Sequence, residues 1–337
     1  MPHRQPEGRR MSHLPLRRRR LLAASALLPS LAAPALAQEA PWPSRPIRIV
    51  VPYPPGGGSD VTARLVATGI QAALGQSVVI DNRAGASGVI GTEAVARSAP
   101  DGYTLLLADL PHTAVPHLMP NLPFDPVADF ASVSLVGVAP MILFANPRLP
   151  ARDARAFAEL ARARPDGFSI ALAGIGGNTH LMSEMFQRVT GTKLVQVPYR
   201  GSGPSITDLA AGQVQVAFTT MLTAAPFLQN NTIRALGVAT AERMPELPDT
   251  PTFREQGIDL VAAHWWGLLA PAGTPAPIVE RVAAALAGAV QEPTIRARMA
   301  TMGLVPQATG PAAFASLIRS DLARWGELVR AAQIRIE

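Results

Sequence analysis

The sequence predicts an α/β protein built from two lobes that face each other across a cleft. Strand-like and helix-like segments alternate along most of the chain, which is typical of α/β units with a largely parallel sheet. The alternation falls into two series, each about the size of one α/β domain. Roughly 300 residues remain after a predicted export signal, more than one compact core usually holds.

The first series contains four short apolar segments, rich in β-branched residues and leucine, that predict buried strands. These strands are expected at residues 47–51, 77–81, 104–108 and 133–138. Helical patterns lie between them at residues 61–74 and 88–97.

The second series repeats the alternation. Its strands are expected at residues 141–146, 168–173, 194–198, 214–219, 233–240 and 261–269, and its helices at 151–163, 179–190, 205–211 and near Ala224. Two long helices follow, at residues 277–290 and 311–332, and we expect them to pack on the first lobe. Domain 1 is therefore expected to comprise residues 38–140 and 262–337, and domain 2 residues 141–261, with a hinge where the chain crosses between them.

The N-terminal 37 residues have the pattern of a cleaved export signal. Four arginines, Arg17 to Arg20, precede an apolar run at 21–33, and a small-x-small site ends at Ala37. The run is too short for a comfortable membrane span, which favours a signal over an anchor. Both the Sec and the twin-arginine export routes fit, and translation could start at Met1 or Met11.

The charge of the chain resides in this signal. The full sequence has a net charge of +6, and residues 1–37 alone hold seven Arg and one Glu, which leaves the mature part near neutrality. The basic character is therefore no sign of nucleic-acid binding. The chain has no cysteine, which excludes disulfides, thiolate metal sites and a lipid-modified N-terminal cysteine. A monomeric protein of a Gram-negative periplasm is the simplest interpretation.

Three glycine-containing turns join a predicted strand to a predicted helix. They lie at residues 52–60 (PYPPGGGSD), 173–180 (AGIGGNTH) and 198–205 (PYRGSGPS). Glycine lets a backbone approach a ligand closely, and a helix N-terminus offers unpaired N–H groups and a partial positive charge. Asn178 or Thr179 is expected to cap the second helix, and Ser202 the third. Such turns on both lobes predict a site for a small anion, such as a di- or tricarboxylate, an aromatic acid or an amino acid.

Several motifs, in order along the mature chain, resemble the tripartite tricarboxylate transporter substrate-binding proteins, also called the Bug family. They are residues 52–60 with Ala63 and Arg64, 81–88 (DNRAGASG) with Gly91, 99–104 (APDGYT), His180 with Leu181, 197–201 (VPYRG), and Gly267 with 270–275 (APAGTP). The resemblance implies a type II-like periplasmic binding protein, with a ligand cleft between two α/β domains joined by a hinge. Family members deliver small carboxylates to membrane permease subunits, and some serve signalling through a sensor kinase.

The resemblance also implies that backbone and hydroxyl groups of the glycine turns hold the ligand carboxylate. The predicted ligand-binding residues are Tyr53, Gly57, Gly58, Ser59, Asp60, Gly176, Asn178, Thr179, Tyr199, Gly201, Ser202 and Thr219. Thr219 stands at a strand end where many members have an aspartate. Without that carboxylate, a ligand's ammonium group loses a candidate partner, so purely anionic ligands are slightly favoured over amino acids.

Some of these residues also have a purely structural interpretation. Asp60 in the first turn of a helix is stabilised by the helix dipole without any ligand. His180 just inside a helix is expected to be satisfied by local backbone, and His112 and His117, beside prolines, are expected to be exposed. Trp265 and Trp266 should point to opposite faces of a strand, one into the core and the other toward the cleft or hinge. Arg83 and Arg200 could pair with a carboxylate, although arginine usually lies at the surface.

An enzyme is the main competing class, and the motifs disfavour it. Ser59, His180 and Asp60 could be imagined as a hydrolytic triad, but no G-x-S-x-G elbow is present, and adjacent Ser and Asp do not suit the relay geometry. No phosphate-binding P-loop or dinucleotide fingerprint occurs, and the six histidines show no metal-ligand spacing, so we expect no cofactor and no metal.

Overall fold

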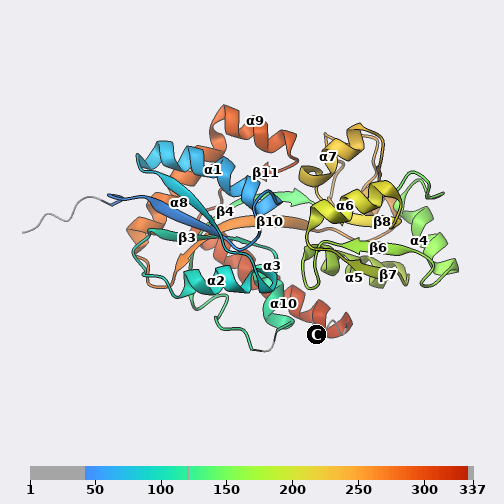
Figure 1. The fold of residues 1–337 in the computed structure, drawn as a ribbon, viewed down its shortest axis with the longest axis horizontal. Coiled ribbons are helices and arrows are strands. Elements are labelled where there is room, and N and C mark those ends of the chain that lie inside the picture. Colours follow the sequence, from blue (N-terminus) through green and yellow to red (C-terminus); the bar gives the residue numbers. More distant parts are fainter. Residues whose placement is uncertain (1–41, 120, 333–337) are drawn as a thin grey trace, which may run out of the picture. The chain divides into compact units, whose positions relative to one another are not determined.

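The computed structural model describes residues 42–119 and 121–332, so the predicted export signal lies outside the described residues. The described chain forms two β-sheets with helices packed against them (Figure 1). The first sheet has the spatial order β11 (Val305–Pro306), β4 (Phe130–Pro140), β10 (Ala263–Pro271), β3 (Thr104–Asp109), β1 (Ile47–Val51) and β2 (Val78–Asn82). The second has the order β7 (Val195–Pro198), β6 (Ser169–Leu172), β8 (Val216–Thr219), β5 (Ile142–Ala145) and β9 (Arg234–Val238).

Both sheets are mixed, which corrects the prediction of largely parallel sheets. In the first, β1 pairs in parallel with β2 and β3, whereas β10 runs antiparallel between β3 and β4. In the second, β6 pairs in parallel with β7 and β8, whereas β5 is antiparallel to β8 and β9. The path of the chain explains the antiparallel strand β10. The chain leaves the first sheet from β4 directly into β5 of the second sheet and returns to the first sheet in β10. Among the described residues between β4 and β10, no helix crosses over the first sheet, as the connection between two parallel strands would require.

Helices cover the faces of both sheets. Those that follow the strands of the first sheet are α1 (Gly58–Leu74), α2 (Val89–Ala96) and α3 (Pro111–Ala114), with short 3-10 turns η1 (Ala86–Gly88) and η2 (Val115–His117). Those of the second sheet are α4 (Ala154–Ala163), α5 (Asn178–Thr190), α6 (Ser202–Ala211) and α7 (Met221–Gln229), with η3 (Arg254–Gln256). The C-terminal helices are α8 (Ala276–Gln291), α9 (Pro293–Thr301) and α10 (Pro311–Ala332). No described helix is long and apolar enough to cross a membrane.

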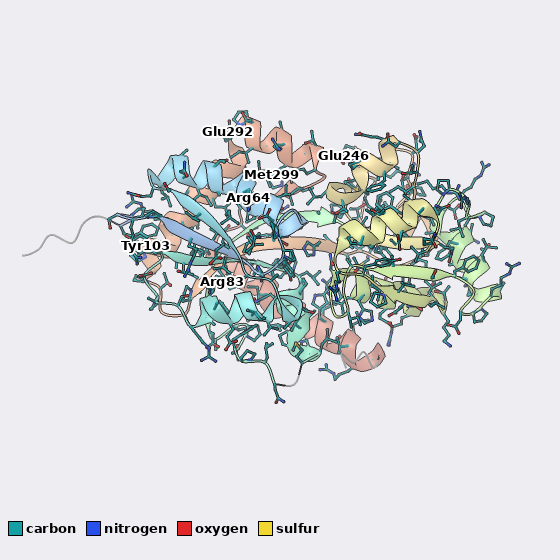
Figure 2. The ribbon with its side chains drawn as sticks, viewed as in Figure 1. Arg64, Arg83, Tyr103, Glu246, Glu292 and Met299 are labelled. Carbon is teal, nitrogen blue, oxygen red and sulfur yellow. The ribbon has the colours of Figure 1, made fainter. Side chains whose placement is uncertain are left out.

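The C-terminal helices pack on the first sheet, as expected. Helix α8 packs beside α1 and against β4, and α10 packs against β4 and α3 (Figure 1). The two adjacent indoles of β10 point to opposite faces, as predicted. Trp265 lies edge-on to Phe314 of α10 and donates to Asp321 at 2.7 Å, while Trp266 belongs to the core beneath α1 and α8. Helix α9, with Met299 buried (Figure 2), and strand β11 were not predicted.

His112 and His117 correct the expectation of exposure. The α3 and η2 turns fold back under α10, which buries the His112 ring between Phe124 and Phe130 and half-buries His117. His117 Nε2 pairs with the Leu322 carbonyl at 2.7 Å. The prolines beside His112 and His117 therefore belong to short, largely buried helical turns, not to the exposed loop that the sequence predicted.

The chain passes between the two sheets at two adjoining points. One residue, Met141, separates β4 of the first sheet from β5 of the second, and the chain re-enters the first sheet directly after Ala262. Met141 N donates to Ala262 O at 3.4 Å, and Ala262 N donates to Ala239 O at 2.9 Å. The two crossing segments therefore run side by side.

Candidate ligand-binding site

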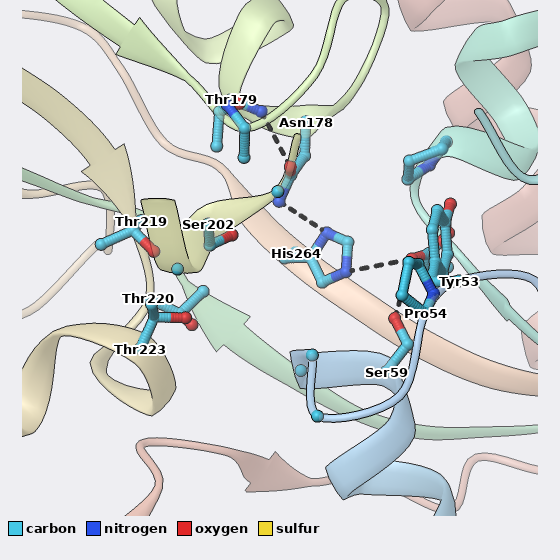
Figure 3. A pocket seen from close by; sticks show the side chains of 18 of the residues that line it. Tyr53, Pro54, Ser59, Asn178, Thr179, Ser202, Thr219, Thr220, Thr223 and His264 are labelled. Atoms are coloured by element: carbon cyan, nitrogen blue, oxygen red, sulfur yellow. Dashed lines mark hydrogen bonds and ion pairs between the residues drawn. The ribbon is translucent and has the colours of Figure 1, made fainter. Parts of the chain in front are cut away.

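A cavity of about 370 Å³ lies where the C-terminal ends of strands from both sheets meet (Figure 3). Strands β1 and β3 lead into it from the first sheet, and β6 and β8 from the second. Ligands of open α/β sheets bind at this edge, because the loops that follow the strands are free to vary there. The cavity is thus built by segments from about residue 53 to residue 266 of the sequence.

Four helices begin at this cavity. The N-cap residues of α1, α5, α6 and α7 are Gly57, Gly177, Gly201 and Thr220, and among the described residues none of the four makes a side-chain capping hydrogen bond. The first N–H groups of a helix have no partner within the helix, so a ligand is free to satisfy them. The N-cap residues are Gly177 and Gly201 instead of the predicted Asn178, Thr179 or Ser202, although the Asn178 side chain does accept from Thr179 N in the first turn of α5.

Glycine matters at two positions of these helix starts, Gly201 and Gly58, for different reasons. Gly201 has a φ of +111°, a conformation that L side chains rarely adopt. Gly58 has ordinary helical geometry, but a Cβ there would lie 2.9 Å from Leu222 Cδ2 and 3.4 Å from Trp266 Cζ2. The absence of a side chain lets the start of α1 approach α7 closely.

Nine of the twelve predicted ligand-binding residues line the cavity. They are Tyr53, Gly57, Gly58, Ser59, Asn178, Thr179, Gly201, Ser202 and Thr219. The remaining three, Asp60, Gly176 and Tyr199, do not line it. The structure therefore brings together residues of all three glycine turns.

Asp60 is bonded to its own turn. Its Oδ2 accepts from Gly56 N at 2.9 Å and from Arg64 Nε at 3.0 Å, and Arg64 lies on the outer side of α1 (Figure 2). Burial by itself would raise the pKa of Asp60, but the hydrogen bonds from Arg64 and Gly56 outweigh it and the pKa is lowered. This is the structural role that the sequence favoured.

Gly176 and His180 form a closed local pair. Gly176 N donates to His180 Nδ1 at 3.0 Å, so this N–H is not available to a ligand. Burial lowers the pKa of His180, and the nearby Glu184 only partly opposes that effect. A histidine satisfied by local backbone is what the sequence predicted at this position.

Tyr199 points away from the cavity toward α6. Its hydroxyl donates to Asp208 Oδ2 at 2.8 Å. Burial together with this hydrogen bond raises the pKa of Tyr199 to about 12, so the phenol stays neutral. The residue fixes the turn before α6 against that helix instead of contacting a ligand.

The second lobe contributes hydroxyl groups and one cation to the cavity wall. Ser202, Thr219, Thr220 and Thr223 line it, and their hydroxyls have no hydrogen-bond partner within the described part of the chain. The exposed guanidinium of Arg200 borders the same wall. Hydroxyl donors, a guanidinium and helix N-termini all favour an anion.

Thr179 has one hydrogen free for a ligand. Its Oγ1 accepts from Ala173 N at 2.8 Å, which fixes the side chain but does not use its own hydrogen. Ser59 differs, because its Oγ donates to Asp109 Oδ2 at 3.1 Å and accepts from Trp266 Nε1 at 2.9 Å. Of these two predicted donors, only Thr179 has its hydrogen left for a bound carboxylate.

The sequence missed Asp109, the last residue of β3, which lines the first-lobe wall. Its Oδ1 accepts from the Tyr53 hydroxyl at 2.8 Å. Burial, the charge of Asp109 and this hydrogen bond raise the pKa of Tyr53 well above its usual range, so Tyr53 remains a donor. A single aspartate at the end of a buried strand does not form a sequence motif. Its position at the C-terminal end of β3 is the one feature from which the sequence could have predicted a role at the site.

The triad considered for a hydrolase is not assembled. Ser59 is bonded to Asp109 and Trp266, Asp60 to Arg64, and His180 to Gly176. Within residues 42–119 and 121–332, no three metal-ligating side chains cluster either.

A cavity at the strand ends of two α/β lobes, lined by helix N-termini, defines a two-lobed solute-binding protein. Residues 62–334 match the model of the tripartite tricarboxylate transporter family receptor. The protein BugT of Bordetella pertussis is 38% identical over 303 residues, which cover 89% of this chain and 92% of BugT. The chain belongs to the tripartite tricarboxylate transporter receptor family, as its motifs indicated.

Solved structures agree with this assignment. The chain is similar to MatC of Rhodopseudomonas palustris, solved with bound malate, with 34% identity, a TM-score of 0.79, and coverage of 85% of this chain and 99% of MatC. It is also similar to a second R. palustris protein, solved with adipate, with 32% identity, a TM-score of 0.82, and coverage of 88% and 100%. The two-lobed periplasmic binding protein fold predicted from the sequence is thereby confirmed.

Proposed function

We propose that this protein is a periplasmic receptor that binds a small organic carboxylate in the cavity and delivers it to a tripartite tricarboxylate-type membrane permease. The observation that carries the proposal is the convergence of four helix N-termini on one cavity. Its second-lobe wall adds Arg200 and four hydroxyls without protein partners among the described residues. Each of these groups favours a carboxylate over a neutral ligand.

The relatives support this ligand class. Malate and adipate, which two similar proteins carry in their solved structures, are small dicarboxylates. The matched family is one of receptors, which supports binding over catalysis. A periplasmic receptor must be exported, and residues 1–37 act as the export signal, cleaved near Ala37. The mature protein then has two domains, residues 38–140 with 262–337 and residues 141–261. These domains move relative to each other about the crossings near Met141 and Ala262.

A thermal-shift screen of residues 38–337 against mono-, di- and tricarboxylates, amino acids and aromatic acids tests the binding function. A ligand at a hundredfold above its Kd should add about 2.7 kcal/mol to the free energy of unfolding. We expect stabilisation by one class of acid. If no acid stabilises the protein, and native mass spectrometry shows no co-purified ligand, the carboxylate-receptor proposal is wrong.

The delivery step needs a separate experiment in cells. Uptake of the stabilising acid should fall when the receptor is deleted and should return when the full chain is restored. A receptor that binds the acid without affecting its uptake would instead point to a signalling role.

A further inference from the structure

The first-lobe wall of the cavity differs in charge from the second-lobe wall. Asp109 borders the cavity with only 4% of its surface exposed. Its two oxygens accept one hydrogen bond each, from Tyr53 and from Ser59. A carboxylate has about four acceptor sites, so two remain for further donors.

His264 lies beside Asp109 and is held in place by Asn178. Thr179 N donates to Asn178 Oδ1 at 2.8 Å, which fixes the orientation of the Asn178 amide. The amide nitrogen then faces His264 Nδ1 at 3.0 Å and donates to it (Figure 3). Nε2, the other ring nitrogen, faces Asp109.

Among the described residues, no arginine or lysine forms an ion pair with Asp109. Its ion-pair contact is with His264 Nε2 at 3.6 Å, which is longer than a hydrogen bond. The N-terminus of α1 lies on the same wall, but a helix terminus carries only about half a unit charge, which offsets Asp109 in part. The opposite wall carries Arg200 and the N-termini of α5, α6 and α7.

The cavity is thus positive at its second-lobe end and negative at its first-lobe end. A ligand that suits both ends has a carboxylate at one end and a hydrogen-bond donor, best a cation, at the other. An unsubstituted dicarboxylate would bring a second negative charge toward Asp109. Burial strengthens this repulsion, because charges interact more strongly away from water.

We propose that Asp109 is a specificity-determining residue that selects acids carrying an ammonium group, such as amino acids, over the same acids without it. This inference rests on the proposed carboxylate-receptor function and names its ligand class. It reverses the slight preference for purely anionic ligands that Thr219 suggested. The carboxylate that Thr219 lacks is supplied from the other lobe by Asp109.

Matched four-carbon acids test the proposal, because aspartate, malate and succinate share one skeleton and differ only in an ammonium, a hydroxyl or a hydrogen. Glutamate with glutarate, and alanine with propionate, extend the test to other lengths and to a single carboxylate. Isothermal titration should show the ammonium form of at least one pair binding roughly tenfold to a hundredfold more tightly, the range for a hydrogen bond to a charged group.

The Asp109→Asn variant keeps an acceptor for Tyr53 and Ser59 but removes the charge. We expect it to lose the preference for the ammonium form and to bind the unsubstituted acid at least as well as the wild type does. Asp109→Ser is the second variant, with the same expected change, should the asparagine variant fail to fold. Asp208→Asn is the matched control, because Asp208 also accepts from a tyrosine, Tyr199, but does not line the cavity.

The outcomes separate the two proposals. Wild-type protein that binds unsubstituted acids more tightly than their ammonium forms overturns the role of Asp109 and leaves the receptor function standing. An unchanged preference in both Asp109 variants also overturns it. Failure of every acid to bind would instead reject the receptor function itself.

Discussion

At the scale of single residues, Thr179 is the clearest test of carboxylate binding. Replacing Thr179 with Val removes the hydroxyl hydrogen that is free for the ligand. We expect the acid identified by thermal shift to bind about 1.5–3 kcal/mol more weakly, as measured by isothermal titration. Thr179→Ser should retain most of the affinity, because it keeps the hydroxyl that accepts from Ala173 N.

Thr207→Val is the control for this substitution. Thr207 is exposed on α6, and its hydroxyl donates to Gly203 O at 2.9 Å instead of bordering the cavity. Its replacement should leave affinity unchanged. Equal affinities for wild-type protein and Thr179→Val would remove Thr179 from the binding site.

The buried His112 predicts how stability depends on pH. Burial lowers the pKa of His112, although a hydrogen bond with Pro126 O and the charges of Asp109 and Asp125 oppose this effect. Its folded pKa therefore lies below the unfolded value of 6.5. Above pH 6.5, His112 is mostly unprotonated in both the folded and the unfolded state. Below pH 6.5, His112 takes up a proton in the unfolded state while it is still neutral in the folded state. Stability should thus fall as the pH decreases through 6.5.

Urea unfolding at pH 7.5 and pH 5.5 measures this contribution. One histidine that stays neutral in the folded state accounts for at most about 1.4 kcal/mol of the loss. His112→Phe should reduce the loss, although it gives up the hydrogen bond to Pro126 O. The same loss in the variant as in the wild type would mean that His112 is not the group responsible.

Sequence reasoning found residues at the site when they belonged to a local pattern. The three glycine turns were predictable because a strand, a glycine turn and a helix follow one another within about ten residues each. Asp109 was not, because its partner Ser59 is 50 positions away and is brought to it by the pairing of β1 with β3. His112 was placed wrongly for the same reason, since Phe124, Phe130 and α10 bury it from a distance.

At the scale of elements, the contact between α1 and α8 depends on a missing side chain. A Cβ on Gly69 would lie 2.4 Å from Ala289 Cβ and 2.8 Å from Ala289 Cα, a backbone atom that cannot rotate away. We expect Gly69→Ala to lower the free energy of unfolding by about 1–3 kcal/mol through overpacking. Urea denaturation measures the change.

Gly288→Ala on α8 is the matched control. Gly288 is exposed, and no atom lies within 4 Å of the Cβ position. Alanine should raise stability there by about 0.5–1 kcal/mol, because glycine is a poor helix former. If both variants raised the free energy of unfolding, helix propensity rather than packing against α8 would govern the effect of alanine at position 69.

Elements were predictable where their own residues determine them. Strand β1 was placed at its observed bounds because four of its five residues are β-branched and apolar. Helix α9 was missed because only Ile295 and Met299 are buried in a segment otherwise rich in polar residues. The direction of β10 could not be read from its sequence, because it depends on the path that the chain takes through the second sheet before it returns.

At the scale of the whole molecule, the four tryptophans all belong to the first lobe. Trp265 and Trp266 lie on β10, Trp325 on α10, and Trp42 beside Arg281 of α8. Tryptophan fluorescence therefore follows the unfolding of the first lobe, whereas far-ultraviolet circular dichroism follows both lobes. Because the cavity is lined from both lobes, we expect a bound acid to raise the thermal midpoint seen by each probe.

A shift seen by circular dichroism but not by fluorescence would contradict this expectation. It would place the ligand on the second lobe alone. Exposed Arg83 pairs with Asp81 at 2.8 Å and does not line the cavity, so Arg83→Gln is a suitable reference variant whose shifts should match the wild type.

The paired crossings at Met141 and Ala262 make the second lobe an insert with neighbouring ends. Met141 N and Ala262 O lie 3.4 Å apart, so an equivalent segment from another family member could be joined at the same two points without stretching the chain. Recombination between genes of this family can then exchange a threonine-lined wall while keeping the wall that holds Asp109. New combinations of the two cavity walls, one from each lobe, would then change which ligands a family member binds.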